Sequence, residues 1–179
     1  MESNKTKSDY NFERLSKVIS PDGTTMAHRL AQDGNLPRKW MTKEVISLAD
    51  SNGKNIASML AYSDALPHEH MTLDILRMPS YFSYFKNTIA HSLTNYKCNR
   101  LPEKRMTAEI LSLANENLST PAHNLAAHGN LPRRFQVPEI LGIKDKFGIS
   151  VGDELNNYKN ANPELCKKVD KFLIRLLRI

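Results

Sequence analysis

Thirteen residues recur almost unchanged within this chain of 179 residues. Residues 25–37 are TMAHRLAQDGNLP, and residues 120–132 are TPAHNLAAHGNLP. Two explanations compete: a duplicated chemical site that contains a histidine, or a structural unit that recurs because the fold is a stack of similar parts. Self-similarity at a fixed period is the signature of repeat architectures, so further copies elsewhere in the chain favour the second explanation.

A Leu-Pro pair marks four copies of the unit. The pairs begin at Leu36, Leu66, Leu101 and Leu131, at spacings of 30, 35 and 30 residues. An acidic residue follows each leucine at the same spacings, at Glu44, Asp74, Glu109 and Glu139. The extra residues of the third copy lie in its connections, where a stack of units tolerates insertions.

Each unit has the pattern of helix, loop, helix. In the first unit one helix face is formed by Met26, Ala27, Leu30 and Ala31. Gly34 and, in the fourth unit, Gly129 stand where these first helices would end. The predicted starts of the second helices are the N-caps Thr42, Thr72 and Thr107, with Pro138 in the first turn of the fourth. No strand pattern of any length competes, so the sequence predicts an all-α fold.

The predicted architecture is a solenoid of about four helix-loop-helix repeats with N- and C-terminal capping helices. The expected divisions are an N-terminal segment with a capping helix at 1–21, units at about 22–50, 51–85, 86–117 and 118–150, and a C-terminal capping region at 151–179. A terminal repeat exposes an apolar face that needs covering. The predicted covering face at the N-terminal end is formed by Tyr10, Phe12, Leu15, Val18 and Ile19.

At the other end, Asn162-Pro163 is predicted to start a helix with an apolar stripe at Leu165, Val169, Phe172, Leu173, Leu176 and Leu177. Lysines and arginines are predicted to lie on the opposite face of this helix. The helix either caps the stack or, as a basic amphipathic helix, docks on a membrane or a partner.

The repeated stretches carry a family resemblance. GTTMAHRLAQDGNLP and LSTPAHNLAAHGNLP resemble the ankyrin-repeat consensus, in which a Thr-Pro-Leu-His stretch opens the first helix and a glycine closes it. The unit is shorter than the usual length of about 33 residues, and the Leu-Pro loop departs from the standard connection. The chain is therefore similar to a divergent bacterial or phage ankyrin-like variant over about residues 22–150.

The resemblance implies that the equivalent histidines His28, His91 and His123 hydrogen-bond the backbone between units, with Ser58 in this place in the second unit. Helices of neighbouring units pack about 8 to 10 Å apart, so these histidines form a row and do not converge. A zinc ion needs its ligands at about 2.0 to 2.1 Å. A structural role is therefore favoured over a ligand or catalytic role.

Motifs of catalysis are absent from the sequence. It has no Gly-rich phosphate loop, no paired-histidine helix motif and no nucleophile elbow. Cys98 and Cys166 lie in no metal or redox spacing and are expected to be reduced thiols in a cytosol. No apolar run approaches the roughly 20 residues of a membrane span. We expect no enzyme activity, cofactor, metal or integral membrane segment, and a cytoplasmic location, including delivery into a host cell.

Recognition is expected in the loops that differ between the units. After the Leu-Pro pairs come RKW at 38–40, HEH at 68–70, EKR at 103–105 and RRF at 133–135. The predicted partner-binding residues are Arg38, Lys39, Trp40, Lys104, Arg105, Arg133, Arg134 and Phe135. Arginine and tryptophan are common binding anchors. The alternative for the aromatics Trp40 and Phe135 is one shared structural slot on the second helix.

A second candidate lies in PSYFSYFKN at 79–87, where Tyr81 and Tyr84 are predicted partner-binding residues. This aromatic cluster either forms a protein-binding hot spot or covers the seam between units two and three.

The predicted function is a non-enzymatic protein-protein interaction module. The formal net charge of +6 favours an acidic protein surface as partner, and the expected setting is a bacterial effector or an inhibitor from a phage or mobile element. The alternative is nucleic-acid binding through the basic inter-helix loops, which predicts a steep loss of affinity as salt rises. The sequence leaves the partner's identity and the oligomeric state open.

Overall fold

The computed structural model describes residues 7–81, 85–95 and 99–164, with side chains from Phe12 onward. These residues form ten α-helices, four short 3₁₀ helices and no strand, which confirms the predicted all-α class. The N-terminal helix is α1 (Lys7–Ser16), and the helix that ends the described region is α10 (Val151–Ala161).

Two kinds of helix alternate between these ends. The longer kind is α2 (Met26–Gln32), α4 (Ile56–Tyr62), α6 (Ile89–Thr94) and α8 (Pro121–Ala127). The second kind is a single turn of helix: α3 (Lys43–Ile46), α5 (Leu73–Leu76), α7 (Ala108–Leu111) and α9 (Pro138–Leu141). A 3₁₀ helix precedes each of these: η1 (Arg38–Trp40), η2 (His68–His70), η3 (Glu103–Arg105) and η4 (Arg133–Phe135).

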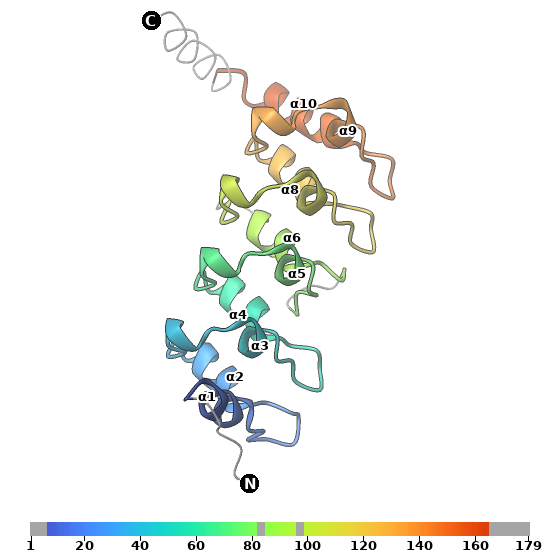
Figure 1. The fold of residues 1–179 in the computed structure, drawn as a ribbon. Coiled ribbons are helices and arrows are strands. Elements are labelled where there is room, and N and C mark those ends of the chain that lie inside the picture. The colour runs from blue at the N-terminus through green and yellow to red at the C-terminus, as the bar shows by residue number, and fades with distance from the viewer. Residues whose placement is uncertain (1–6, 82–84, 96–98, 165–179) are drawn as a thin grey trace, which may run out of the picture.

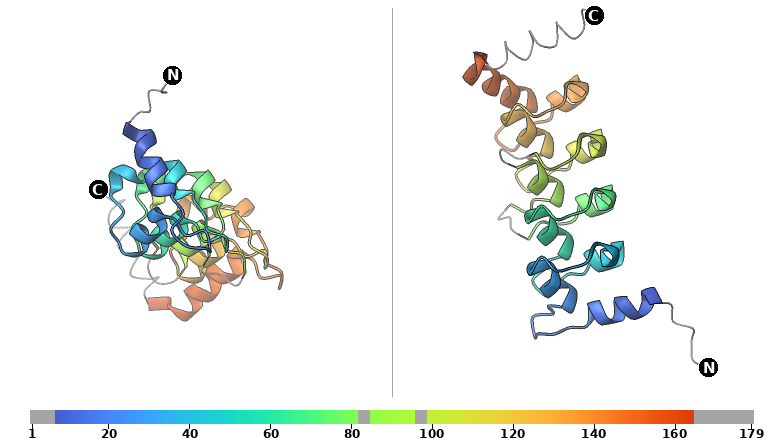
Figure 2. Two further views of the ribbon diagram at one scale, coloured as in Figure 1. Left: turned by 90° about the horizontal axis from the view of Figure 1, so that it is seen from below. Right: turned by 90° about the vertical axis from the view of Figure 1, so that its left-hand side faces the viewer.

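The helices form one elongated stack in chain order (Figure 1). Each long helix contacts the next long helix along the chain, from α2 through α4, α6 and α8 to α10. The long helices and the short helices make two parallel columns, with α1 across one end and α10 at the other (Figure 2). The 3₁₀ helices lie along one edge of the stack, and the turns that connect successive helix pairs project from the opposite edge (Figure 1).

The core is continuous through the stack, and the Leu-Pro leucines belong to it. Leu36, Leu66, Leu101 and Leu131 are all buried, together with small residues of the long helices such as Ala27, Ala57, Ala90 and Ala122. Alanine at these positions lets neighbouring helices approach closely, while the leucine fixes the start of each 3₁₀ helix to the core. The apolar pattern of the sequence thus accounts for which face of each helix is buried.

The predicted starts of the short helices agree with the structure. The Thr42 and Thr107 hydroxyls accept hydrogen bonds from the N–H groups of Val45 and Ile110, as N-caps do, and Pro138 lies in the first turn of α9. Thr72 also stands at the predicted N-cap position, before α5, although its side chain makes no capping bond.

The N-terminal covering face differs from the prediction. Leu15 on α1 is buried, and α1 contacts α2 and α3. The helix ends at Ser16, so Val18 and Ile19 do not belong to it and are exposed. Val18 instead pairs with Thr25 in an isolated β-bridge, which closes the first connecting turn. Extending the helix to residue 19 was therefore wrong, because the turn takes over the backbone there.

The sequence analysis missed helix α10, although it lies within the predicted C-terminal capping region. Ser150 caps this helix, and the Asp153 side chain accepts from the Ser150 backbone N–H in return. Helix α10 packs on α8 and α9 and so covers the last helix pair. The predicted helix with the stripe from Leu165 to Leu177 lies outside the described residues.

Two glycines with the same backbone φ angle differ in how closely another helix approaches them. Gly34 and Gly129 both have φ of +68°, which disfavours any L side chain. A Cβ on Gly34 would meet nothing within 4 Å, whereas a Cβ on Gly129 would lie 2.2 Å from the ring of Tyr158 on α10. Gly34→Ala is therefore expected to cost about 1 to 2 kcal/mol from the backbone alone. Gly129→Ala is expected to cost more, because the ring must also move.

Denaturant unfolding of both variants measures the difference. Equal losses would show that the Tyr158 ring is displaced freely and that α10 does not pack tightly on the fourth unit.

Candidate functional site

The four 3₁₀ helices together carry an excess of positive charge, and we call η1 to η4 the basic edge. They carry six cationic residues and two carboxylates, a net charge of +4 out of the chain's +6. Each begins after a proline with extended backbone, whose fixed φ prepares the tight turn that follows. Because the preceding leucine is buried, the charged residues project outward.

Arg38 is bound to the neighbouring unit. Its Nε and Nη2 atoms donate to the two carboxylate oxygens of Glu69 at 2.9 and 2.7 Å, a bidentate pair between η1 and η2. This hydrogen bond from Arg38 lowers the pKa of Glu69 to about 2. The pair is exposed on both sides, so its contribution to stability is small. It nevertheless fixes the direction of the Arg38 guanidinium.

Arg134 makes a similar contact with the preceding unit, whereas Arg38 contacts the following unit. Its Nη2 donates to the backbone carbonyl of Glu103 at 2.6 Å, and its Nε lies 3.5 Å from the Glu103 carboxylate. Arg105, at the end of η3, is half-buried, and its buried Nε has no hydrogen-bond partner. Arg38 and Arg134 are thus held by contacts with neighbouring units, whereas no such contact holds the Nε of Arg105.

The aromatic residues of this edge pack inward. Trp40 and Phe135 are half-buried and contact the hydrophobic core, each at the last position of its 3₁₀ helix. The Lys39 ammonium lies 5.7 Å from the centre of the Trp40 ring, and the Arg134 guanidinium lies 4.7 Å from that of Phe135. Trp40 and Phe135 therefore occupy one shared structural slot, which was the alternative to a binding role. A cation also lies over each ring, in the arrangement of a cation–π interaction.

The remaining predicted cations of the basic edge, Lys39, Lys104 and Arg133, are exposed. An open hollow of about 330 Å³ lies beside Arg38, between the first two units. It is lined by Arg38, Met41, Asp64, Leu66, Pro67 and His68. Both a cation and apolar atoms therefore face a space large enough for a side chain of another molecule.

Ion pairs between units were not anticipated from the sequence. Lys43 pairs with Asp74 at 2.6 Å, and Arg77 pairs with Glu109 at 3.2 Å. In the sequence, the regularly spaced acids serve only as markers of the repeat. The cations that they pair with stand 31 and 32 residues earlier, a spacing close to one repeat, and this periodic pairing was the available signal.

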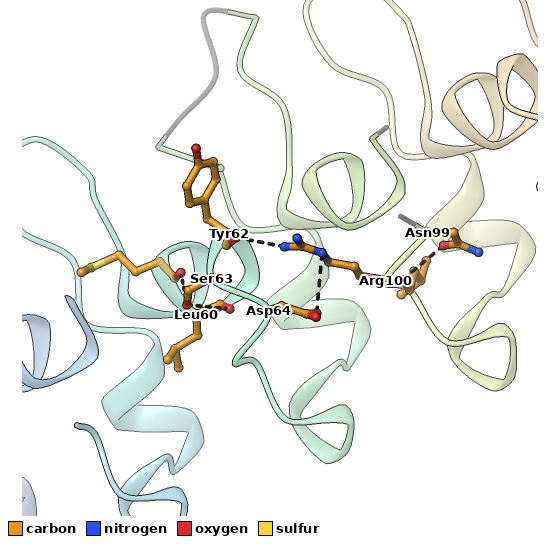
Figure 3. Close-up of polar contacts among 8 residues, drawn as sticks. Leu60, Tyr62, Ser63, Asp64, Asn99 and Arg100 are labelled. Atoms are coloured by element: carbon orange, nitrogen blue, oxygen red, sulfur yellow. Dashed lines mark hydrogen bonds and ion pairs between the residues drawn. The ribbon is translucent and has the colours of Figure 1, made fainter. Parts of the chain in front are cut away.

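Arg100 joins the second and third helix pairs near the same edge (Figure 3). Its Nη1 donates to the backbone carbonyl of Tyr62 at 2.9 Å, and its Nε lies 3.7 Å from the Asp64 carboxylate. Asp64 has a positive φ of 61° at the position where the first and fourth units have Gly34 and Gly129. This contact also was missed, because the equivalent residues before the other Leu-Pro pairs, Asn35, Ala65 and Asn130, carry no charge.

The repeated histidines connect consecutive units. His28, His91 and His123 each accept at Nδ1 from the backbone N–H of the preceding helix cap, Thr25, Thr88 or Thr120. Their Nε2 atoms lie 2.9 to 3.2 Å from the backbone carbonyls of Lys54, Ser119 and Ile149 in the next turn. Since an N–H only donates and a carbonyl only accepts, the ring proton lies on Nε2. Burial lowers the pKa of His91.

The second unit uses a different residue for this connection. Ser58 stands at the histidine position, but its hydroxyl donates only to the carbonyl of Asn55, at 2.9 Å within the same unit. Asn55 itself accepts from the Ser58 N–H at 2.7 Å and donates from Nδ2 to the Pro79 carbonyl at 2.8 Å. Asn55 therefore combines the capping and the linking roles. The resemblance pointed to Ser58 and did not identify Asn55.

The other predicted binding residue of the described region lies elsewhere. Tyr81 is exposed on the edge of the connecting turns, where the Lys54 ammonium lies 5.6 Å from its ring centre. The structure thus does not bring Tyr81 together with the basic edge. Tyr84, Cys98 and Cys166 lie outside the described residues.

Within residues 7–81, 85–95 and 99–164, no group of three or more histidine, cysteine or acidic residues is arranged to hold a metal ion. None of the helices in this part of the chain has the length and apolar character needed to span a membrane.

No protein-family model matches the sequence, and no curated protein matches it significantly.

Proposed function

We propose that this chain is a non-enzymatic protein-interaction module, built as a solenoid of ankyrin-like repeats with the unit boundaries predicted from the sequence. The stacked helix pairs and the histidine bonds between units support the repeat assignment. The setting that we propose with it is cytoplasmic, as a bacterial effector or as an inhibitor from a phage or mobile element.

The basic edge is the proposed contact surface. The observation that carries this proposal is the row of cations along this edge, two of which, Arg38 and Arg134, are held in direction by contacts with neighbouring units. Cations that are already oriented lose less conformational entropy when a partner binds. The partner surface is therefore acidic, and the hollow beside Arg38 accommodates one of its side chains.

A protein partner fits this edge better than a nucleic acid does. Single-stranded nucleic acids are bound by cations together with aromatic rings on which bases stack. Trp40 and Phe135 pack against the core, each with a cation over its ring, so their faces are not open for stacking. Glu69 and Glu103 also interrupt the row of positive charge, which disfavours a phosphate backbone.

Charge reversal on the basic edge tests the proposal. The double variant Lys39→Glu with Lys104→Glu is expected to reduce capture of the partner at least tenfold, because two exposed cations then repel an acidic surface. Unfolding free energy is expected to change by about 0.5 kcal/mol or less per site. The measurement is affinity capture from the native or host cell, with captured proteins compared between wild type and variant.

The matched control is Lys17→Glu with Lys159→Glu, which makes the same change in net charge at exposed positions outside the basic edge. This control is expected to retain capture. Equal losses in both double variants would assign binding to overall charge and refute the basic edge. Tight, steeply salt-dependent binding of a DNA or RNA oligonucleotide would favour the nucleic-acid alternative instead.

A further inference from the structure

Each long helix from α2 to α8 is linked by a side chain to the connecting turn that follows its unit, and we call each such link a seam. Three of the seams depend on a buried histidine: His28, His91 and His123 are 2%, 1% and 4% exposed. In each ring Nδ1 accepts from a backbone N–H, and Nε2 donates to a backbone carbonyl of the next turn. Both nitrogens of the neutral ring are therefore in use.

Protonation of such a ring places a second N–H where an acceptor stood. In the first unit, the Nδ1 atom of His28 lies 3.3 Å from the backbone nitrogen of Thr25, so two donors then face each other. The Thr25 hydroxyl oxygen, 2.8 Å from Nδ1, can accept the new proton, but the buried Thr25 N–H loses its acceptor. The ring must also carry its charge away from water. Both effects disfavour the charged ring in a closed seam.

The ionisable group that acts on His91 from another helix is itself a histidine. Burial has the largest effect and lowers the pKa of His91, the hydrogen bond to the Ser119 carbonyl opposes this in part, and His123 on α8 lowers the pKa further. Two charged rings in neighbouring units would repel each other. The third and fourth units thus share a cost that a single buried histidine does not have.

Carboxylates on the helices and turns packed against these histidines have other partners. Asp74, Glu109 and Glu116 pair with lysine or arginine, and Asp50, Asp145 and Asp153 accept hydrogen bonds near their own turns. Glu13 on α1 is exposed, and Glu154 on α10 is half-buried. The cations on these elements would repel a charged ring; they are Arg14, Lys54, Lys146 and Lys159.

The seam between the second and third units is built from an amide. Asn55 accepts from the Ser58 N–H at 2.7 Å and donates to the Pro79 carbonyl at 2.8 Å. An amide side chain does not ionise, so it keeps both bonds when the pH falls. The chain therefore combines three seams that depend on pH with one that does not.

We propose that the chain is an acid-sensitive stack: protonation of His28, His91 and His123 opens the seams toward its two ends, while the Asn55 seam keeps the second and third units together. The first of the opening seams joins the same two units as the contact of Arg38 with Glu69, so acid also loosens that part of the basic edge. The inference concerns the stability of the stack and does not rest on the proposed function.

The pH range of the effect follows from the two states of the histidines. A histidine that stays neutral when folded but ionises freely when unfolded, with a pKa of about 6.5, stabilises the fold fully above that pH and progressively less below it. Carboxylates act lower: the pKa of Glu69 is lowered from 4.5 to about 2, so its contribution is lost only below its usual value. The range from about pH 7.5 to about pH 5.5 therefore isolates the histidines.

Denaturant unfolding at these two pH values tests the proposal. The equilibrium constant for unfolding of the wild type is expected to rise at least tenfold at the lower pH, because each histidine held neutral contributes up to about tenfold. Thr88→Asn with His91→Ser copies the Asn55 seam into the third unit and is expected to remove up to about tenfold of this rise. The reverse exchange, Asn55→Thr with Ser58→His, is expected to add a similar amount.

The control His68→Gln removes an exposed histidine and is expected to keep the full pH dependence. Hydrogen exchange of the wild type locates the opening and needs no variant: at the lower pH, protection factors are expected to fall more in α2 and α8 than in α4. An equal fall in all three helices would overturn the proposal. So would an unfolding constant that is the same at both pH values, or a Thr88→Asn with His91→Ser variant that is as pH-dependent as the wild type.

Discussion

Replacing Leu131 with alanine is expected to lower the free energy of unfolding by about 2 to 5 kcal/mol. Leu131 is 3% exposed and lies in the core cluster at the same place in the fourth unit as Leu36 does in the first. Removing its branched end leaves a cavity that the surrounding helices fill only in part. Denaturant unfolding followed by circular dichroism measures the loss.

The charge-reversed variant Lys39→Glu with Lys104→Glu serves as the comparison for this experiment. Its cations are exposed, so its unfolding curve is expected to stay close to that of the wild type. A leucine variant as stable as the wild type would show that the Leu-Pro loop does not depend on its buried leucine. A charge variant that unfolds as readily as Leu131→Ala would mean that the basic edge belongs to the fold and not to recognition.

Asn55→Ala is expected to cost about 2 to 4 kcal/mol, much more than Ser58→Ala, at about 1 kcal/mol or less. Asn55 is 2% exposed and links α4 to the next turn through the Pro79 carbonyl. Its loss leaves the Pro79 carbonyl and the buried Ser58 N–H without their partner in the protein. Ser58→Ala removes only one bond to a carbonyl that also accepts from the Met59 N–H.

His123→Ala supplies the reference for this pair, since His123 makes both the capping and the linking bond in the fourth unit. Asn55→Ala and His123→Ala are expected to destabilise the protein to a similar degree. The reverse order in the second unit, with Ser58→Ala the more damaging change, would restore the assignment implied by the resemblance to ankyrin repeats.

The sequence by itself determined the local structure of this protein. The all-α class, the ends of the long helices near Gly34 and Gly129, the caps Thr42 and Thr107, and the shared slot of Trp40 and Phe135 all follow from positions that recur along the chain. Such features depend on neighbouring residues and on which face of a short helix is apolar. The periodic pattern of the sequence indicates both.

The tertiary structure decided which residues meet across neighbouring units. The bidentate contact of Arg38 with Glu69, the link from Asn55 to Pro79 and the separation of Tyr81 from the basic edge join or divide residues 24 or more positions apart. Leu118 likewise reveals its strain only through its φ angle. A repeat pattern aligns equivalent positions, but the reach and direction of a side chain toward the next unit depend on how the helices pack, which only the folded stack defines.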